Sequence, residues 1–187
     1  MPSDPVSSEN KQPLRTTPLT ALHRSLGGKL VAFAGYDMPV QFEPGILKEH
    51  LHTREAAGLF DVSHMGQVVL HGDEAAAALE KLVPGELQAL KPGRMRYTML
   101  LNEAGGILDD LMVTRTDGGL FVVVNAACKE ADIALMRAAL PASVSVEPLE
   151  DRALLALQGP RAAAILQQRT ETDLAGLKFM SSVTIPV

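Results

Sequence analysis

The sequence predicts an α+β fold with a largely antiparallel sheet and packed helices. Apolar, β-rich segments are joined by Gly-rich turns, as at Asn102 to Gly106 and Asp117 to Gly119, which is typical of strands paired antiparallel. Segments with helix start and stop signals interrupt these strands. The 187 residues, 47% hydrophobic and 21% charged, suit one globular domain with a sizeable core.

In chain order, two helices are expected first. Pro18 to Leu26 has Thr17 available as an N-cap, and a Gly pair directly after it ends the helix. The second is expected over Ile46 to Ala57, where the next glycine stops it. The polar residues Met1 to Pro13 are expected to form a mobile tail.

The sheet is expected to follow these helices. Its strands are expected at Gly66 to Leu70, Arg96 to Leu101, Ile107 to Val113 and Leu120 to Val124. Further helices are expected over Gly72 to Leu82, Lys129 to Leu140 and Pro160 to Gln168. The end of the chain, Ser181 to Val187, reads as another β-rich segment without a closing turn. Because a domain seldom ends within a strand, we expect this chain to be the front portion of a longer protein.

Charge and composition exclude several classes of function. The net charge of -5 and the pI near 5.5 argue against nucleic-acid binding, which requires clustered Lys and Arg. No apolar run reaches the roughly 20 residues of a membrane helix. The single Cys128 excludes an intramolecular disulfide, and the N-terminal residues resemble no secretory or transit peptide. A cytoplasmic protein with small-molecule or protein partners is therefore expected.

The histidines do not have the spacing of a metal site. His50 and His52 are two residues apart, which on a helix places them about 200° apart and prevents shared ligation. No HExxH pattern occurs, so no metal is expected. His64 precedes a strand and is expected to be a hydrogen-bonded structural residue. Ser63 beside it is not expected to be a nucleophile, because neighbouring strand residues point to opposite faces.

The adjacent Asp109 and Asp110 are the candidate functional residues. In a strand, Asp109 shares a face with Leu111 and Val113, and Asp110 shares one with Met112. A carboxylate on an apolar face costs several kcal/mol, or its pKa rises, unless it meets a donor, a cation or a polar cavity. Two interpretations stay open. In the first, the role is structural: the pair caps the Gly-rich turn or accepts backbone N–H groups near the strand start. In the second, one carboxylate acts in an apolar cleft on a reaction that develops positive charge. The pattern does not choose between the two aspartates.

Other candidates have weaker patterns. Asn125 follows a predicted strand and could cap the next helix or bind a heterocycle through its amide. Met65, with other methionines, could line an apolar pocket or fill the core. Tyr97 is one of two tyrosines in a chain without Trp, so few rings are available to sandwich a ligand.

Five runs, in order, resemble one known family. They are "TPLTALHRSLGGKLVAFAGYDMPVQF", "HLHTREAAGLFDVSHMGQV", "NEAGGILDDLMV", "VVVNAACKEAD" and "LLALQGPRAAAIL". Together they closely resemble the N-terminal half of the glycine cleavage system T protein, the aminomethyltransferase family, from about Thr16 to Met180. One run alone would be a weak signal, but the five in this order are highly specific.

The resemblance implies a tetrahydrofolate-dependent transferase that acts on an aminomethyl group carried by the lipoylated H protein. It implies that residues 14–187 are the N-terminal portion of a folate-binding domain, the first part of an α+β duplication, with the second half and the terminal β-barrel absent. Among the residues, it implies Asp110 as the key acid and Asn125 as a motif residue. It also implies that Tyr97 and Met65 border the folate channel, while His23 is structural.

Two alternatives from other classes stay open. One is the folate-binding module of a sarcosine- or dimethylglycine-oxidising enzyme, which would need a flavin domain upstream. The other is a non-catalytic folate-binding relative serving iron–sulfur cluster assembly, which typically has a "KGCYxGQE"-type motif. The intact "FDVSHMG" and "GGILDDL" runs favour the transferase. Because this half would form only part of the folate pocket, we expect the chain alone to bind folate weakly or not at all.

Overall fold

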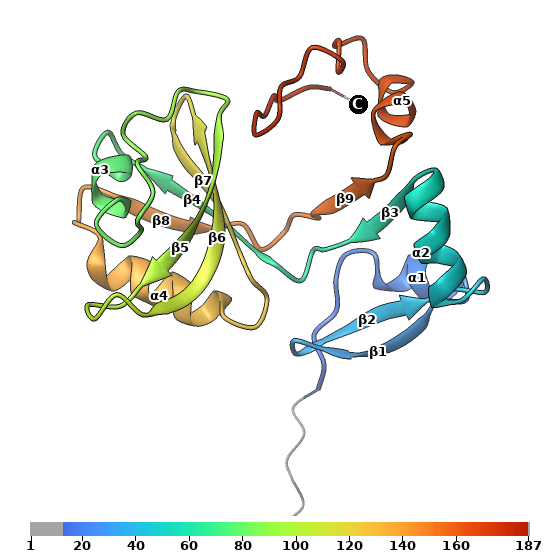
Figure 1. Cartoon of the computed structure of the whole chain (residues 1–187). Helices are drawn as coiled ribbons and strands as arrows, with labels where there is room; N and C mark the ends of the chain where they lie inside the picture. The colour runs from blue at the N-terminus through green and yellow to red at the C-terminus, as the bar shows by residue number, and fades with distance from the viewer. Residues whose placement is uncertain (1–12, 187) are drawn as a thin grey trace, which may run out of the picture.

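The larger of two lobes is built on a five-stranded antiparallel sheet (Figure 1). The computed structural model describes residues 13–186, and in it the strands of this sheet follow the order β5-β6-β7-β4-β8. Their bounds are β4 (Gly66–His71), β5 (Met95–Leu101), β6 (Ile107–Thr116), β7 (Gly119–Val124) and β8 (Ser145–Pro148). The α+β class with a largely antiparallel sheet is confirmed.

One face of this sheet carries the hydrophobic core. Strand β7 alternates between buried and half-buried residues, so that Leu120, Val122 and Val124 are fully buried on the core side. Two helices cover this face, α3 (Ala75–Leu79) and α4 (Lys129–Ala139). Each fully buried Leu or Val contributes about 1.5–3 kcal/mol, and the core that these residues share extends from β4 to β8.

The opposite face of the sheet has little cover. Tyr97 on β5 is 57% exposed, whereas Met99, Met112 and Val123 are half-buried. Cross-strand pairing places Tyr97 opposite Met112, Met112 opposite Val123 and Met99 opposite Asp110. Residues paired in this way point to the same side of a sheet, so an apolar surface surrounds Asp110 on this open face.

The smaller lobe precedes the sheet in the sequence. It contains α1 (Thr20–Ser25), the antiparallel pair β1 (Lys29–Phe33) and β2 (Tyr36–Gln41), and α2 (Ile46–Glu55). Strand β3 (Gly58–Asp61) then pairs with the distant β9 (Leu155–Gln158), which returns from the larger lobe (Figure 1). Helix α5 (Ala162–Gln167) follows β9. Within the described part of the chain no helix has the length and apolar character needed to cross a bilayer.

Several expectations about elements were wrong. Strands β1, β2, β3, β8 and β9 were not predicted, and the helix expected over Gly72 to Leu82 is confined to α3. Ser181 to Pro186 forms no strand, and only Ser181 makes an isolated bridge, to Arg94. The expected tail lies outside the described residues except for Pro13.

Thr17 does not cap α1. Leu19 is the N-cap residue and makes no side-chain cap, whereas the Thr17 hydroxyl donates to Asp61 Oδ2 at 2.6 Å. A tertiary hydrogen bond to β3 therefore takes the place of the expected local cap.

Candidate functional site

The two adjacent aspartates lie on opposite faces of β6. Asp109 pairs with Leu100 and shares the core face with the buried Leu111, while Asp110 pairs with Met99 on the open face. Both residues are half-buried. The turn before β6 is satisfied by another side chain, because Asn102 Oδ1 accepts the amides of Ala104 and Gly106. Asn102, and not the two aspartates, therefore caps this turn, whereas backbone N–H groups of Asp110 and Asn125 hydrogen-bond to Asp109.

Asn125 connects the two aspartates. Its Nδ2 lies 3.0 Å from Asp109 Oδ1 and 2.9 Å from Asp110 Oδ1, and it also donates to the Asp110 backbone carbonyl at 3.2 Å. Strands β6 and β7 pair Leu111 with Val124, so the residue that follows Val124 lies beside the two carboxylates. The Asn125 side chain does not cap α4, since that helix begins after Cys128 without a side-chain cap. Its amide is instead occupied by the two aspartates.

A third aspartate completes this group. Asp132, in the first turn of α4, is 3% exposed. Burial, and after it a hydrogen bond with Asp109 and the negative charge of that residue, raise the pKa of Asp132 to about 7. Burial also opposes ionisation of Asp109, but hydrogen bonds from Asn125 and Asp132 outweigh it and lower the pKa of Asp109. We call Asp109, Asp110, Asn125 and Asp132 the carboxylate cluster.

Tyr97 lies next to the cluster on the open face. Hydrogen bonding to Asp110, followed by burial and the charges of Asp110 and Asp109, raises the pKa of the Tyr97 phenol. The phenol is therefore neutral at physiological pH and can donate to a ligand or to Asp110. The structure thus brings Asp110, Asn125 and Tyr97 together, and the roles that the resemblance implies for them stay predictions.

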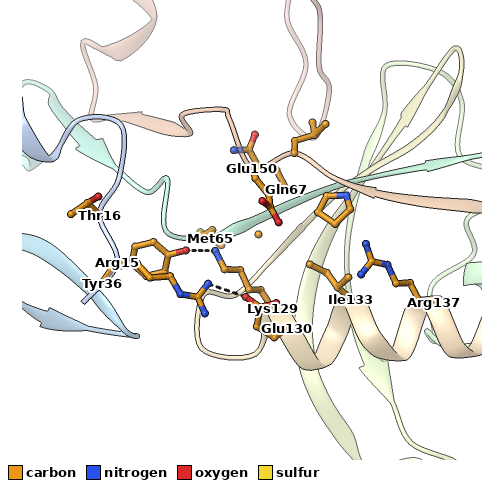
Figure 2. Close-up of a pocket in the computed structure, with 13 residues that line it drawn as sticks. Arg15, Thr16, Tyr36, Met65, Gln67, Lys129, Glu130, Ile133, Arg137 and Glu150 are labelled. Carbon is orange, nitrogen blue, oxygen red and sulfur yellow. Dashed lines mark hydrogen bonds and ion pairs between the residues drawn. The ribbon is translucent and has the colours of Figure 1, made fainter. Parts of the chain in front are cut away.

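Met65 lines a cavity of about 330 Å³ (Figure 2). This cavity is lined by Arg15 and Tyr36 from the smaller lobe and by Met65 and Lys129 from the larger one, and not by Asp110, Asn125 or Tyr97. Lys129 Nζ donates to Tyr36 Oη at 2.5 Å and to the His64 carbonyl at 3.0 Å. Because Gly66 pairs with Val124, Met65 and Asn125 are the residues that come next along the two paired strands. The place of Met65 in a folate channel stays a prediction.

His64 differs from its expected environment. Its Nδ1 is buried and has no hydrogen-bond partner among the described residues, and its ring packs edge-on against Phe33 and Tyr36. Burial, with the charge of Lys129, lowers the pKa of His64 although the charge of Asp61 acts in the opposite direction. The predicted hydrogen-bonded His64 is thus an apolar packing residue.

A second, larger and more apolar cavity lies in the smaller lobe. It has a volume of about 770 Å³ and is lined by residues of α1, β2, α2 and β3, including Leu22 and Leu59, and by Phe42 in the connection between β2 and α2. His23 borders it and is buried, with Nε2 2.8 Å from Asp61 Oδ2, which is the structural role expected for this histidine. In the described part of the chain, no group of three or more His, Cys, Asp or Glu side chains is arranged so that it could hold a metal ion.

The carboxylate cluster can act on a cationic or hydrogen-bonding ligand. Asp110 offers a negative charge on an open sheet face, Asn125 holds one of its oxygens in place, and the flanking side chains are apolar. A flat heterocycle with N–H donors fits such a face, because it can cover Met99, Met112 and Val123 while it pairs with the carboxylate. The residues present therefore fit a pterin-like cofactor.

Two residues of these sites were missed by sequence reasoning. Asp132 lies four residues before the buried Met136, on the apolar side of α4. An acid on the apolar side of a helix is the sequence signal that could have identified it. Lys129 has no local signal, because its partners Tyr36 and His64 come from distant segments.

Comparisons with known proteins identify the family of this chain. The family model described as "GCVT N-terminal domain" matches residues 19–187. Curated relatives include the mitochondrial aminomethyltransferase of Homo sapiens, 47% identical over 93% of this chain and 45% of its own length. The aminomethyltransferase of Synechococcus elongatus is 44% identical over 91% of this chain and 48% of its own length. The crystal structure of the glycine cleavage system aminomethyltransferase T from Bartonella henselae superposes with a TM-score of 0.83 and 46% identity, covering 90% of this chain and 46% of that one.

The fold and these matches define the class: the chain corresponds to the N-terminal part of aminomethyltransferase proteins. It belongs to the GCVT N-terminal domain family. The chain spans about half the length of the curated relatives it matches.

Proposed function

We propose that this chain provides the acidic, folate-facing half of a tetrahydrofolate-dependent aminomethyltransferase of the glycine cleavage system. In this proposal the methylene carbon passes from the aminomethyl group on the lipoylated H protein to tetrahydrofolate, with release of ammonia and of the dihydrolipoyl H protein. The observation that carries it is the position of Asp110, held by Asn125 at 2.9 Å on an apolar sheet face. Membership of the family and the names of the relatives support it.

Asp110 supplies electrostatic stabilisation in this reaction. When the carbon–sulfur bond of the substrate weakens, positive charge develops on its CH2–NH2 unit. A carboxylate held in place by an amide, on a surface that bound folate would shield from water, interacts strongly with that charge. Tyr97, neutral at physiological pH, borders the same surface and can orient the ligand.

The partners and location belong to the same proposal. The lipoylated H protein and tetrahydrofolate follow from the proposed reaction, and no part of it involves nucleic acid or a membrane. A cytoplasmic location is proposed from the single Cys128 alone. The relatives from Homo sapiens and Dictyostelium discoideum are named as mitochondrial.

Two proteins test the proposal together. The first is this chain alone, which we expect to bind tetrahydrofolate more weakly than micromolar affinity in a calorimetric titration. The second is a chimera in which the remaining C-terminal part of the Synechococcus elongatus relative follows Val187. We expect the chimera to form methylenetetrahydrofolate from loaded H protein; a folded chimera without this activity would contradict the proposed function.

The role of Asp110 is tested in the same chimera. Asp110→Asn removes the charge without changing the shape of the side chain, so we expect turnover to fall on the order of 10²-fold or more with an unchanged circular dichroism spectrum. Asp109→Asn, which alters the core-facing acid, should lower turnover less. Wild-type turnover in Asp110→Asn would remove Asp110 from the mechanism, and the reverse order of the two effects would assign the role to Asp109.

A further inference from the structure

Two buried carboxyl groups of the carboxylate cluster have no role in the proposed mechanism. Asp109 Oδ2 and Asp132 Oδ2 are both buried, and neither has a hydrogen-bond partner among residues 13–186. A buried oxygen without a donor loses its hydration without replacement, at a cost of about 1–3 kcal/mol. Two carboxylates facing each other would also repel.

One proton removes both problems. The carboxyl groups of Asp132 and Asp109 are within hydrogen-bonding reach of each other. If Asp132 is a carboxylic acid, its O–H can donate to Asp109, and each of the two carboxyl groups gains a partner in the other. The other oxygen of Asp109 is already fixed by Asn125 Nδ2 at 3.0 Å. The raised pKa of Asp132 and the lowered pKa of Asp109 agree with a proton that resides on Asp132.

We propose that Asp132 is a positioning residue for Asp110: its protonated carboxyl group holds Asp109, Asp109 holds the amide of Asn125, and that amide holds Asp110. The chain of contacts runs from the first turn of α4 to the open face of the sheet. Loss of the proton places two negative charges side by side in the core and withdraws the donor that fixes Asp109. The amide of Asn125 then loses its fixed geometry, and Asp110 loses its orientation. The functional part of this inference rests on the proposed function.

The Cys128 thiol and the Tyr97 phenol, which lie near the cluster, do not change charge near pH 7. Burial, followed by the charges of Asp109, Asp132 and Asp110, raises the pKa of the Cys128 thiol, and the pKa of the Tyr97 phenol is also raised. Both groups therefore stay neutral.

The remaining charges near the start of α4 are engaged elsewhere. Lys129 donates to Tyr36 and to the His64 carbonyl, and Glu130 pairs with Arg15. The pair of Asp109 and Asp132 is thus the group expected to titrate near pH 7 beside Asn125.

The direct test follows the Asn125 side-chain amide by ¹⁵N–¹H NMR in this chain. We expect its signals to shift with a midpoint near pH 7 in the wild type, because the amide donates to Asp109. In Asp132→Asn the signals should stay constant over the same range, since the new amide donates to Asp109 at every pH. The matched control is Asp117→Asn, at an exposed turn residue, which should keep the wild-type titration.

The outcomes decide the inference. A wild-type Asn125 amide without a titration near pH 7, or a titration that persists in Asp132→Asn, overturns it. If Asp132→Asn does not fold, the titration of the Asn125 amide in the wild type still decides whether the proton is present. Loss of that titration in Asp109→Asn then decides whether the pair of Asp109 and Asp132 carries the proton.

Activity separates this inference from the proposed function. In the chimera, Asp132→Ala should lower kcat on the order of 10-fold to 100-fold with little change in KM for folate, and Asp132→Asn should restore most of it. The wild-type kcat should also decline above pH 7, whereas that of Asp132→Asn should not decline there. A titrating amide in an inactive chimera contradicts the proposed function alone. An active chimera in which both Asp132 variants keep the wild-type pH profile contradicts the positioning role alone.

Discussion

At the scale of single residues, Asp61 joins separate parts of the smaller lobe. Its Oδ2 accepts the Thr17 hydroxyl at 2.6 Å and lies 2.8 Å from His23 Nε2, and its Oδ1 accepts the Ser63 amide at 2.9 Å. Burial opposes ionisation of Asp61, but hydrogen bonds from Ser63, Thr17 and His23 outweigh it and lower its pKa from the ordinary value of 3.8. One buried carboxylate therefore holds the segment before α1, the helix itself and the end of β3.

Asp61→Asn should destabilise the protein by about 1–3 kcal/mol in urea unfolding at neutral pH, because the charge that these donors serve is removed. Because the pKa of Asp61 is lower in the folded protein than its ordinary value of 3.8, this carboxylate stabilises the fold above about pH 3.8. That stability is lost as the pH falls toward the lowered pKa of the folded state. The wild type should therefore lose more stability than Asp61→Asn between about pH 5 and about pH 3. Asp37→Asn, which removes an exposed pair with Arg24, is the control and should cost less than about 1 kcal/mol. Equal losses in the two variants would contradict the role of Asp61.

The sequence could identify Asp109 and Asp110 because a strand with acids on two apolar faces needs an explanation. It could not identify their partners. Asn125 follows β7, and only the pairing of β6 with β7 places it against both carboxylates. Asp132 requires the packing of α4 on the sheet, which no local pattern specifies.

At the scale of elements, the turn between β6 and β7 brings the backbone of Gly119 against β4. Gly119 has φ +144°, and a Cβ at this position would lie 2.1 Å from the Leu70 carbonyl oxygen. Gly119 also pairs with His71 in the sheet. Only a residue without a side chain allows β4 and β7 to approach here.

Gly119→Ala should therefore destabilise the protein by about 2–4 kcal/mol, because the clash is with backbone that cannot move without breaking the β4–β7 pairing. The measurement is the midpoint of thermal or urea unfolding. Gly118→Ala is the matched control: its Cβ would meet nothing within 4 Å, so it should change stability by less than about 1 kcal/mol. Equal stability of the two variants would show that the turn can relax.

Prediction of elements succeeded where a segment carried its own pattern. Strands β4 to β7 alternate or run apolar between Gly-rich turns, and α2 and α4 have clear stop signals. The short β3 and β9 were missed because each is only four residues long and they pair with each other across the whole larger lobe. At Ser181 to Pro186 a strand was expected and none forms, because this segment has no partner strand among the described residues despite its β-rich composition.

At the scale of the whole molecule, the larger lobe is an insertion between β3 and β9. The core cluster lies entirely between Val68 and Val146. The two points where the chain enters and leaves this lobe are adjacent, since the Val62 amide donates to the Leu154 carbonyl at 2.9 Å. The inserted lobe thus has its own core and neighbouring ends, which are properties of an independent folding unit.

A fragment of residues 62–154 should therefore fold alone. We expect dispersed amide signals in NMR and one cooperative unfolding transition, although the contacts of Lys129 with Tyr36 and of Arg15 with Glu130 are lost. A shorter fragment that ends at Val124 removes α4 and β8, so it should not unfold cooperatively. Random-coil spectra for residues 62–154 would show that the smaller lobe is needed for the core to form.

The pairing of β3 with β9 also sets an order of events during protein synthesis. The ribosome releases β3 long before β9, because every residue of the larger lobe must be translated between them. The central sheet can close while the chain is still growing, but the small sheet must wait for its second strand. Until then Leu59 and Phe60 have no strand beside them, and this is the interval in which a nascent chain most needs a chaperone.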